Sequence, residues 1–321
     1  MTPSSPLVSV IIPAYNAAGT IGETLASLQG QRFARWEAIV ADDGSSDATP
    51  SLVSAHAARD PRIRLVRLPA NTGLPACARN AALAVARGKW IAFLDADDLW
   101  ESEKLSLQLA HLRRTGARWA FSNSRFFGGG DAHPDGLKYA RSYRPPHPFF
   151  PSLLTGDGVP FLTVIAARNL LEQVAPGGRL GRVFDEAPAL KAVEDSDLTL
   201  RLAGLAEPAY VPRPLARYRA HAGGISKRAD ANYAARVALI RKHQRLGAPA
   251  RLCRRAFRLQ RSKYGIDLLF AGRPGWRRHL LASTLGVPCT GRDIFLAALG
   301  CFPAESARWL YHWVLAARRR L

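Results

Sequence analysis

The chain has 321 residues, 48% hydrophobic and 22% charged, a composition that excludes a disordered, collagen-like or disulfide-scaffold protein. This length favours one large domain or two smaller ones. The net charge of +20 belongs to the C-terminal third, because residues 1–200 hold 21 Lys and Arg against 20 Asp and Glu, whereas residues 201–321 hold 24 against 5. The asymmetry indicates an anionic partner, such as membrane headgroups, a nucleic acid or a phosphorylated carrier.

Strand-like and helix-like segments alternate over the first 125 residues. Short apolar runs predict strands at residues 7–12, 37–41, 62–68 and 90–94. Helical spacing predicts helices at residues 17–28, 74–86 and 101–114, with a further helix after residue 47. Near-continuous apolar strands that alternate with helices are typical of a parallel sheet covered on both faces. The sequence therefore predicts an α/β fold with a doubly wound, mostly parallel sheet.

A long loop at residues 124–160 interrupts this alternation, since it contains Gly128–Gly130 and several prolines. Loops of this length usually carry function. Beyond it we expect further elements, namely a strand at 161–166, helices at 168–174 and from residue 195, and short strands at 209–211 and 215–218. From about residue 232 the pattern predicts helices only, rich in Arg and Ala, so a basic α-helical C-terminal region follows the sheet.

The four cysteines show no C-x-x-C spacing and predict reduced thiols rather than a zinc or redox site: Cys77, Cys253, Cys289 and Cys301. The apolar run at residues 7–12 has no basic residues before it and ends at Pro13, so we interpret it as a strand rather than a signal peptide. No uncharged apolar run reaches the roughly 18 residues of a membrane-spanning helix. These features favour a cytoplasmic location.

Polar clusters follow three of the predicted strands, where the ligand cleft of an open α/β sheet lies. They are Pro13-Ala14-Tyr15-Asn16, Asp42-Asp43-Gly44-Ser45 and Asp95-Ala96-Asp97-Asp98. Carboxylates two residues apart repel one another unless a cation or hydrogen-bond donors neutralise them, and a divalent ion completed by substrate phosphates is a usual solution. The alternative is that Asp95 and Asp97 only cap the helix that follows.

A second acidic cluster, Glu194-Asp195-Ser196-Asp197, opens a predicted helix. It either caps this helix or supplies a general base, because a carboxylate can take a proton from a hydroxyl group. His221 lies in a Gly-flanked loop, where a lone histidine is more often structural than a ligand. The glycine-rich fingerprints of P-loop and dinucleotide-binding proteins are absent from the sequence, so carboxylates and a metal would have to hold any nucleotide.

Together these segments resemble the glycosyltransferases of family 2, which have the GT-A fold. The resemblance rests on an ordered set of motifs: Val8-Ser9-Val10-Ile11-Ile12-Pro13-Ala14-Tyr15-Asn16, Asp42-Asp43-Gly44-Ser45-Ser46-Asp47, Asn71-Thr72-Gly73-Leu74, Ala78-Arg79-Asn80, Phe93-Leu94-Asp95-Ala96-Asp97-Asp98 and Glu194-Asp195-Ser196-Asp197-Leu198. It covers residues 7 to about 226, and each motif alone is weak. Residues 1–226 would form the GT-A domain, with a nucleotide-binding half at 1–123 and an acceptor half at 124–226, and residues 227–321 the basic helical region.

The resemblance implies an inverting transfer of a sugar from a nucleotide-diphosphate donor to an acceptor hydroxyl. It implies donor-binding roles for Pro13, Ala14, Tyr15, Asp43, Arg79, Asp95 and Ala96. In the DXD motif Asp95-Ala96-Asp97, it assigns Asp97 to a divalent metal, Mg²⁺ or Mn²⁺, with His221 as a further contact. It assigns Asp195 as the base that deprotonates the acceptor, with Glu194 beside it.

The expected partners are a UDP-sugar donor, a glycan or lipid-linked acceptor and an anionic membrane surface. Basic residues recur at helical spacing after residue 240, and the last helix combines Trp309 with Arg318–Arg320, which suits a membrane surface or a solvated helical face. No nucleic-acid recognition motif is present in the sequence. We expect peripheral binding at the inner face of a bacterial cell membrane, in surface-polysaccharide assembly. The alternative is an inactive GT-A-like protein whose basic helices dock to a polyanion.

Overall fold

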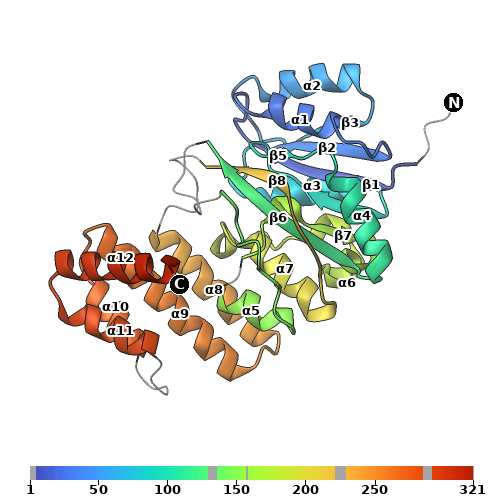
Figure 1. Ribbon diagram of the computed structural model, residues 1–321. Helices are drawn as coiled ribbons and strands as arrows, with labels where there is room; N and C mark the ends of the chain where they lie inside the picture. The colour runs from blue at the N-terminus through green and yellow to red at the C-terminus, as the bar shows by residue number, and fades with distance from the viewer. Residues whose placement is uncertain (1–4, 129–135, 157, 221–228, 285–290, 321) are drawn as a thin grey trace. The chain divides into compact units, whose positions relative to one another are not determined.

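The computed structural model describes residues 5–128, 136–156, 158–220, 229–284 and 291–320 (Figure 1). The chain divides into two compact units. An N-terminal unit comprises residues 1–153 and 158–224, and a C-terminal unit comprises residues 154–157 and 225–321.

A parallel sheet forms the first half of the N-terminal unit. Its strands, in the spatial order β3-β2-β1-β4, are β1 (Val8–Ala14), β2 (Trp36–Asp42), β3 (Ile63–Arg67) and β4 (Trp90–Phe93). The helices between and after them are α1 (Ile21–Gln29), α2 (Thr49–Arg59), α3 (Pro75–Ala84) and α4 (Lys104–Thr115). Every residue of β2 is buried, as expected for a parallel strand covered on both faces. The predicted α/β class and alternation are confirmed.

A mixed half continues the same sheet beyond β4, in the order β7-β6-β8-β5. Its strands are β5 (Leu99–Trp100), β6 (Trp119–Phe127), β7 (Ile165–Ala167) and β8 (Ala209–Arg219). β7 runs antiparallel to both β4 and β6, whereas β8 runs parallel to β6. Its helices are α5 (Phe149–Thr155), α6 (Arg168–Val174) and α7 (Glu194–Leu205), with 3₁₀ turns η1 (Phe161–Thr163), η2 (Pro176–Gly178), η3 (Leu180–Arg182) and η4 (Pro188–Leu190).

Three details of this mixed half differ from the expectation. Strand β6 was not predicted, because its centre is the polar triplet Ser122-Asn123-Ser124, which is buried and hydrogen-bonded. The strand expected at residues 161–166 begins as the 3₁₀ turn η1. The two short strands expected near residues 209–218 form the single strand β8, whose pairing with β6 shifts register at Asn123 opposite Pro214. Proline donates no hydrogen bond, so it is tolerated at such an irregularity.

The C-terminal unit is helical, as predicted. Its helices are α8 (Ala229–Arg245), α9 (Ala250–Phe270), α10 (Trp276–Thr284), α11 (Gly291–Cys301) and α12 (Ala304–Arg320). They have a core of their own, formed by Leu268, Leu269, Trp276, Leu280, Leu296, Leu299 and Ala307. Within the described ranges, no helix is both long enough and apolar enough to cross a membrane. Cys77, Cys253 and Cys301 are free thiols, and Cys289 lies outside the described residues.

Candidate active site

Three loops that follow parallel strands meet at one edge of the sheet. β1 lies between β2 and β4, and the parallel register pairs Ala14, at the end of β1, with Asp42 at the end of β2. The segments after β1, β2 and β4 therefore leave the sheet at its carboxyl edge, where open α/β sheets bind ligands. The sequence prediction that these polar clusters share one edge is confirmed.

The loop after β1 is tied to the loop after β2 by short hydrogen bonds. The Asn16 side chain accepts a hydrogen bond from the Ser46 amide at 3.0 Å, and the Asn16 amide donates to Ser45 Oγ at 2.9 Å. Asn16 adopts a positive φ of 48°, a conformation that asparagine tolerates better than most residues. Tyr15, the residue before Asn16, is 52% exposed, so its ring is available to a ligand at this edge. Ala14 is buried, and Pro13 is half-buried.

Asp43 is buried and holds the turn at Thr72–Gly73. Its carboxylate accepts hydrogen bonds from the Thr72 amide at 3.0 Å, the Thr72 hydroxyl at 2.9 Å and the Gly73 amide at 3.2 Å. Gly44 next to it has a φ of 70°, and a Cβ placed there would lie 2.5 Å from the Asn71 nitrogen, so only glycine fits. Asp43 thus joins the Asp42–Ser45 and Asn71–Leu74 motifs into one structure.

The loop after β4 carries three carboxylates within four residues, Asp95, Asp97 and Asp98. The Ala96 carbonyl fixes this loop to α1, because it accepts the hydroxyls of Thr20 at 2.9 Å and Thr24 at 3.0 Å. Burial of Asp98, together with the charges of Asp95 and Asp97, raises the pKa of the Asp98 carboxyl well above its usual value. Burial and the neighbouring negative charges therefore both disfavour a charge on Asp98.

Arg219, at the end of β8, also contacts this loop. Its amide donates to Asp98 Oδ1 and its Nε donates to the Asp97 carbonyl, each at 2.8 Å. Its Nη2 forms an ion pair with Glu23 at 2.7 Å. Sequence reasoning assigned no role to Arg219, although it stands two residues before His221. His221 itself lies outside the described residues.

The chemistry of the Asp95–Asp98 loop fits a hard divalent cation. Carboxylate oxygens are the ligands that Mg²⁺ and Mn²⁺ prefer, and a concentrated negative charge favours binding of a cation. The described part of the chain contains no cluster of three His, Cys, Asp or Glu side chains arranged as a complete metal site. This is compatible with Mg²⁺, which one or two carboxylates often hold together with substrate phosphates.

Arg79, on α3, joins the loop after β4 to the start of α7. Its Nη2 donates to Asp95 Oδ1 at 2.8 Å, and its Nη1 donates to Glu194 Oε1 at 2.7 Å. Burial alone would lower the pKa of Arg79, but the charges of Asp95, Glu194 and Asp195 outweigh it and raise that pKa above its usual value. Carboxylates from distant segments thus act on one guanidinium.

The first turn of α7 places Glu194, Asp195 and Asp197 in different surroundings. Glu194 is buried against Arg79, and Asp197 is buried and paired with Arg201 at 2.9 Å. Asp195 is half-buried, and its Oδ1 accepts a hydrogen bond from the Ser196 amide. Three residues earlier, Ala192 adopts a φ of 76°, an uncommon conformation for a residue with a Cβ. Of the three carboxylates, Asp195 is the most accessible.

Asn80, the neighbour of Arg79, fixes the segment that leads to α7. Its side-chain amide donates to the Phe184 carbonyl at 2.9 Å and to Glu186 at 2.8 Å, and its Oδ1 accepts the Phe184 amide at 2.9 Å. The sequence analysis included Asn80 in a motif without a role. Polarity together with burial identifies it as an anchor, and burial becomes known only from the structure.

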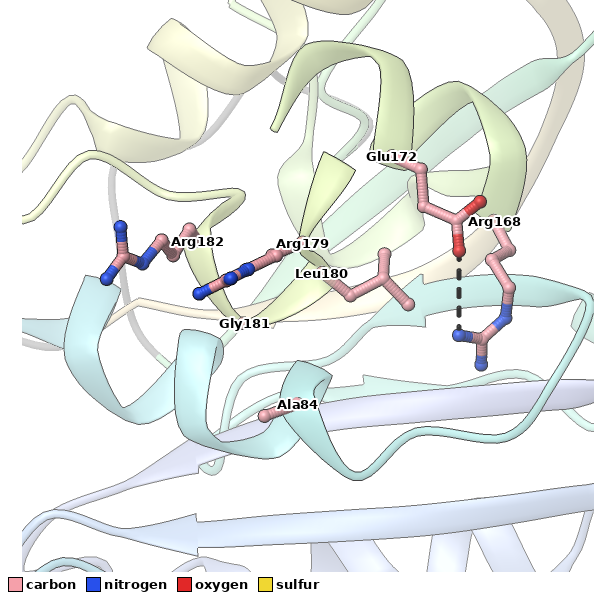
Figure 2. Close-up of a pocket in the computed structure, with 7 residues that line it drawn as sticks. All are labelled: Ala84, Arg168, Glu172, Arg179, Leu180, Gly181 and Arg182. Atoms are coloured by element: carbon pink, nitrogen blue, oxygen red, sulfur yellow. Dashed lines mark ion pairs between the residues drawn. The ribbon is translucent and has the colours of Figure 1, made fainter. Parts of the chain in front are cut away.

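Figure 2 shows a cavity of the N-terminal unit, which has a volume of about 420 Å³. It is lined by Ala84, Arg168, Glu172, Arg179, Leu180, Gly181 and Arg182. Arg168 donates hydrogen bonds to the carbonyls of Ala86 and Gly88, just before the start of β4. The cavity is therefore at the amino end of β4, opposite the end that carries Asp95 and Asp97.

Comparison with known proteins finds relatives of the N-terminal part of the chain. Residues 9–165 match the model of glycosyl transferase family 2. The chain is 35% identical over 165 residues to the UDP-Glc:alpha-D-GlcNAc-diphosphoundecaprenol beta-1,3-glucosyltransferase WfgD of Escherichia coli, a match that covers 51% of this chain and 62% of that protein. It is 42% identical over 118 residues to the succinoglycan biosynthesis protein ExoO of Rhizobium meliloti (strain 1021), covering 37% of this chain and 33% of ExoO.

Solved structures show the same fold. S. aureus TarS 1-349, in complex with UDP-GlcNAc, superposes with a TM-score of 0.63 at 19% identity, over 94% of this chain and 87% of that one. The mannosyltransferase PcManGT from Pyrobaculum calidifontis, in complex with GDP-Man and Mn²⁺, gives 0.59 at 20% identity, over 99% and 88%. The fold is thus of the GT-A type.

The predicted resemblance is confirmed: residues 9–165 match the family 2 glycosyltransferase model, and the relatives of the chain include glycosyltransferases of bacterial polysaccharide synthesis. The matched segments span 48%, 62% and 33% of the lengths of three of these curated relatives. The roles of the individual site residues stay predictions.

Proposed function

We propose that this protein is an inverting glycosyltransferase that moves a sugar from a nucleotide-diphosphate donor to an acceptor hydroxyl. The observation that carries the proposal is the arrangement around Arg79, which brings the Asp95–Asp98 loop and the Glu194–Asp195 pair to one site. The carboxylates of the Asp95–Asp98 loop can then act at the leaving diphosphate, while Asp195 acts at the acceptor hydroxyl. The family 2 domain supports this reading over an inactive docking protein.

In this proposal the carboxyl edge of the parallel strands binds the donor. Tyr15 and the Asp43–Thr72 turn receive the nucleoside, and the Asp95-Ala96-Asp97 motif faces the ribose and the diphosphate. A divalent ion held by Asp97 would neutralise the charge that develops on the departing diphosphate. Asp195 takes the proton from the acceptor hydroxyl as that oxygen attacks the sugar, because a half-buried carboxylate can accept a proton directly.

We propose a UDP-sugar as donor and a lipid-linked glycan as acceptor, in the assembly of a bacterial surface polysaccharide. Support comes from the name of WfgD, which states a UDP-Glc donor and a diphosphoundecaprenol-linked acceptor, and from the UDP-GlcNAc complex of TarS. In keeping with the sequence analysis, residues 1–123 would bind the nucleotide and residues 124–226 the acceptor. PcManGT, with GDP-Man and Mn²⁺, supports a divalent metal.

A nucleotide panel tests the donor site. We expect UDP with Mn²⁺ to raise the melting temperature of the chain, whereas UDP with EDTA does not. At about 100 times its dissociation constant, a nucleotide stabilises the fold by ~2.7 kcal/mol, which a thermal-shift assay detects. GDP, dTDP and CMP are measured in parallel, and a metal-dependent rise with GDP alone would reassign the donor. Absence of a rise with all four nucleotides would contradict the proposed function.

We further propose that the C-terminal unit binds the cytoplasmic face of an anionic membrane, where a lipid-linked acceptor is available. Residues 225–321 hold 20 Lys and Arg against 4 Asp and Glu. A cavity of about 620 Å³ within this unit is lined by Phe302, Glu305, Ser306, Trp309 and Leu310. Trp309 is 67% exposed and Phe302 is 44% exposed. Basic charge combined with exposed aromatic side chains is characteristic of membrane-surface helices.

Replacing Trp309 by Ser is expected to weaken binding to phosphatidylglycerol vesicles about 10- to 150-fold, because burying one large apolar side chain contributes ~1.5–3 kcal/mol. Sedimentation with vesicles measures this. Leu246→Ser is the control, since Leu246 is 63% exposed in the same unit and does not line the cavity. Equal binding by the wild type and the Trp309 variant would exclude this surface as the membrane contact.

A further inference from the structure

The Arg79 guanidinium is poorly accessible to a nucleotide-sugar donor. Its two terminal nitrogens are each engaged by a carboxylate, Asp95 on one side and Glu194 on the other, at 2.8 and 2.7 Å. Its side chain is only 7% exposed. Its Nε is buried and has no hydrogen-bond partner among the described residues. Because the side chain is almost fully buried, little of this guanidinium is within reach of a phosphate group.

Aromatic rings enclose the same guanidinium. The Arg79 Cζ atom lies 5.2 Å from the ring centre of Phe161 and 5.4 Å from that of Phe184. Phe184 is in turn held by the buried Asn80 through its backbone amide and carbonyl. Arg79 and Asn80 are neighbours on α3, so this helix fixes both the segment leading to α7 and the first residue of α7.

Glu194 is equally enclosed. Its side chain is 7% exposed, one oxygen accepts the Arg79 hydrogen bond, and the other is buried with no partner among the described residues. A general base must lie within hydrogen-bond reach of the proton that it takes, and burial keeps an acceptor hydroxyl away from Glu194. Glu194 is therefore better placed to anchor α7 than to act as a base beside Asp195.

We propose that Arg79 is a positioning residue, which sets the place of Asp195 relative to the Asp95–Asp97 motif by holding Glu194 and Asp95 at once. It does not bind the donor phosphates. The inference rests on the proposed function, and it replaces the roles that the resemblance suggested for Arg79 as a donor contact and for Glu194 as a catalytic residue beside Asp195. A guanidinium suits this task because its rigid fork bonds two carboxylates, whereas a lysine ammonium is a single point of charge.

The test is a double-mutant cycle of Arg79→Met and Glu194→Gln. Two properties are measured for each variant: the dissociation constant of UDP in the presence of Mn²⁺, and kcat for transfer from the donor that the nucleotide panel identifies. Arg79→Met is expected to lower kcat about 100-fold, since a shift of about 1 Å in a catalytic group costs that much. UDP affinity should change less than about threefold. The double variant should be no slower than Arg79→Met alone, because the two side chains act as one unit.

Opposite results overturn the inference. A tenfold or larger loss of UDP affinity with kcat preserved would make Arg79 a donor contact, and multiplicative losses of kcat in the double variant would show that the two side chains act independently. Arg79→Lys is expected to recover little of the lost kcat, and full recovery would show that charge alone suffices. If Arg79 only stabilised the fold, Arg79→Met would lower the stability of the chain, and it would not lower kcat while UDP affinity is preserved.

Folding is controlled separately. Arg87→Met removes an arginine that pairs with the buried Glu37 near the start of β2, at the opposite end of the sheet, and should leave kcat unchanged. If Arg79→Met does not fold, Glu194→Gln alone decides, since it keeps the side-chain shape: lowered kcat with normal UDP affinity supports the inference, and unchanged kcat overturns it. A wild-type chain that transfers sugar from no donor would instead refute the proposed function.

Discussion

Asp195→Asn is expected to lower kcat for sugar transfer by about 10² to 10⁴-fold, the usual contribution of a general base, while UDP still binds in the presence of Mn²⁺. The amide of asparagine cannot take the proton from the hydroxyl group of the acceptor. Its oxygen can still accept the hydrogen bond that Asp195 Oδ1 receives from the Ser196 amide, so the first turn of α7 should keep its geometry. Steady-state transfer rates and UDP titrations measure the two effects.

A matched substitution tests whether loss of any carboxylate has the same effect. Asp267→Asn in α9 makes the same chemical change in the C-terminal unit, where Asp267 pairs only weakly with Lys263 at 3.6 Å. This variant should transfer sugar at the wild-type rate. Full transfer activity in Asp195→Asn would exclude Asp195 as the base and direct the search to another carboxylate.

Asp97→Ala is expected to abolish the Mn²⁺-dependent stabilisation by UDP, so that the ~2.7 kcal/mol gained at about 100 times the dissociation constant disappears. The physical reason is that the motif loses one of the few carboxylates that can hold a hard cation against the diphosphate. The Arg219 side chain donates a hydrogen bond from Nε to the main-chain carbonyl of Asp97. This bond does not depend on the Asp97 side chain, so the loop should stay in place.

Two comparisons make this result specific. The wild type with EDTA should behave like Asp97→Ala with Mn²⁺, and the unliganded variant should melt as one cooperative transition. If UDP affinity with Mn²⁺ were the same in the variant and the wild type, Asp97 would not be a metal ligand. The metal would then have to be held elsewhere, or donor binding would have to proceed without it.

The fold class was predictable from sequence because its signals are local. Strands β1, β2 and β4 are near-continuous apolar runs, and such runs are typical of a parallel sheet that is buried on both faces. Polar residues that directly follow these strands had to gather at one edge, because parallel strands end on the same side. That topology alone predicts that Asp43 and Asp95 lie at the same edge of the sheet.

Elements that depend on tertiary burial were not predictable in the same way. Strand β6 contains the buried polar residues Ser122 and Asn123, which form hydrogen bonds with Thr163 and Tyr139 from other segments. Hydrogen bonds of this kind offset the cost of burying polar groups, and a local pattern does not reveal them. The same holds for Arg219, whose contacts with the Asp97–Asp98 segment join positions about 120 residues apart in the chain.

The sequence by itself determined the α/β class, the family 2 motifs and the helical nature of the basic C-terminal region, because periodicity and short motifs are read along the chain. Only the tertiary structure decided which charges meet. Arg79 lies 115 positions from Glu194 and 16 from Asp95, and the folded sheet brings all three within ion-pair distance. An ion pair depends on distance and burial in space, which the order of residues along the chain does not specify.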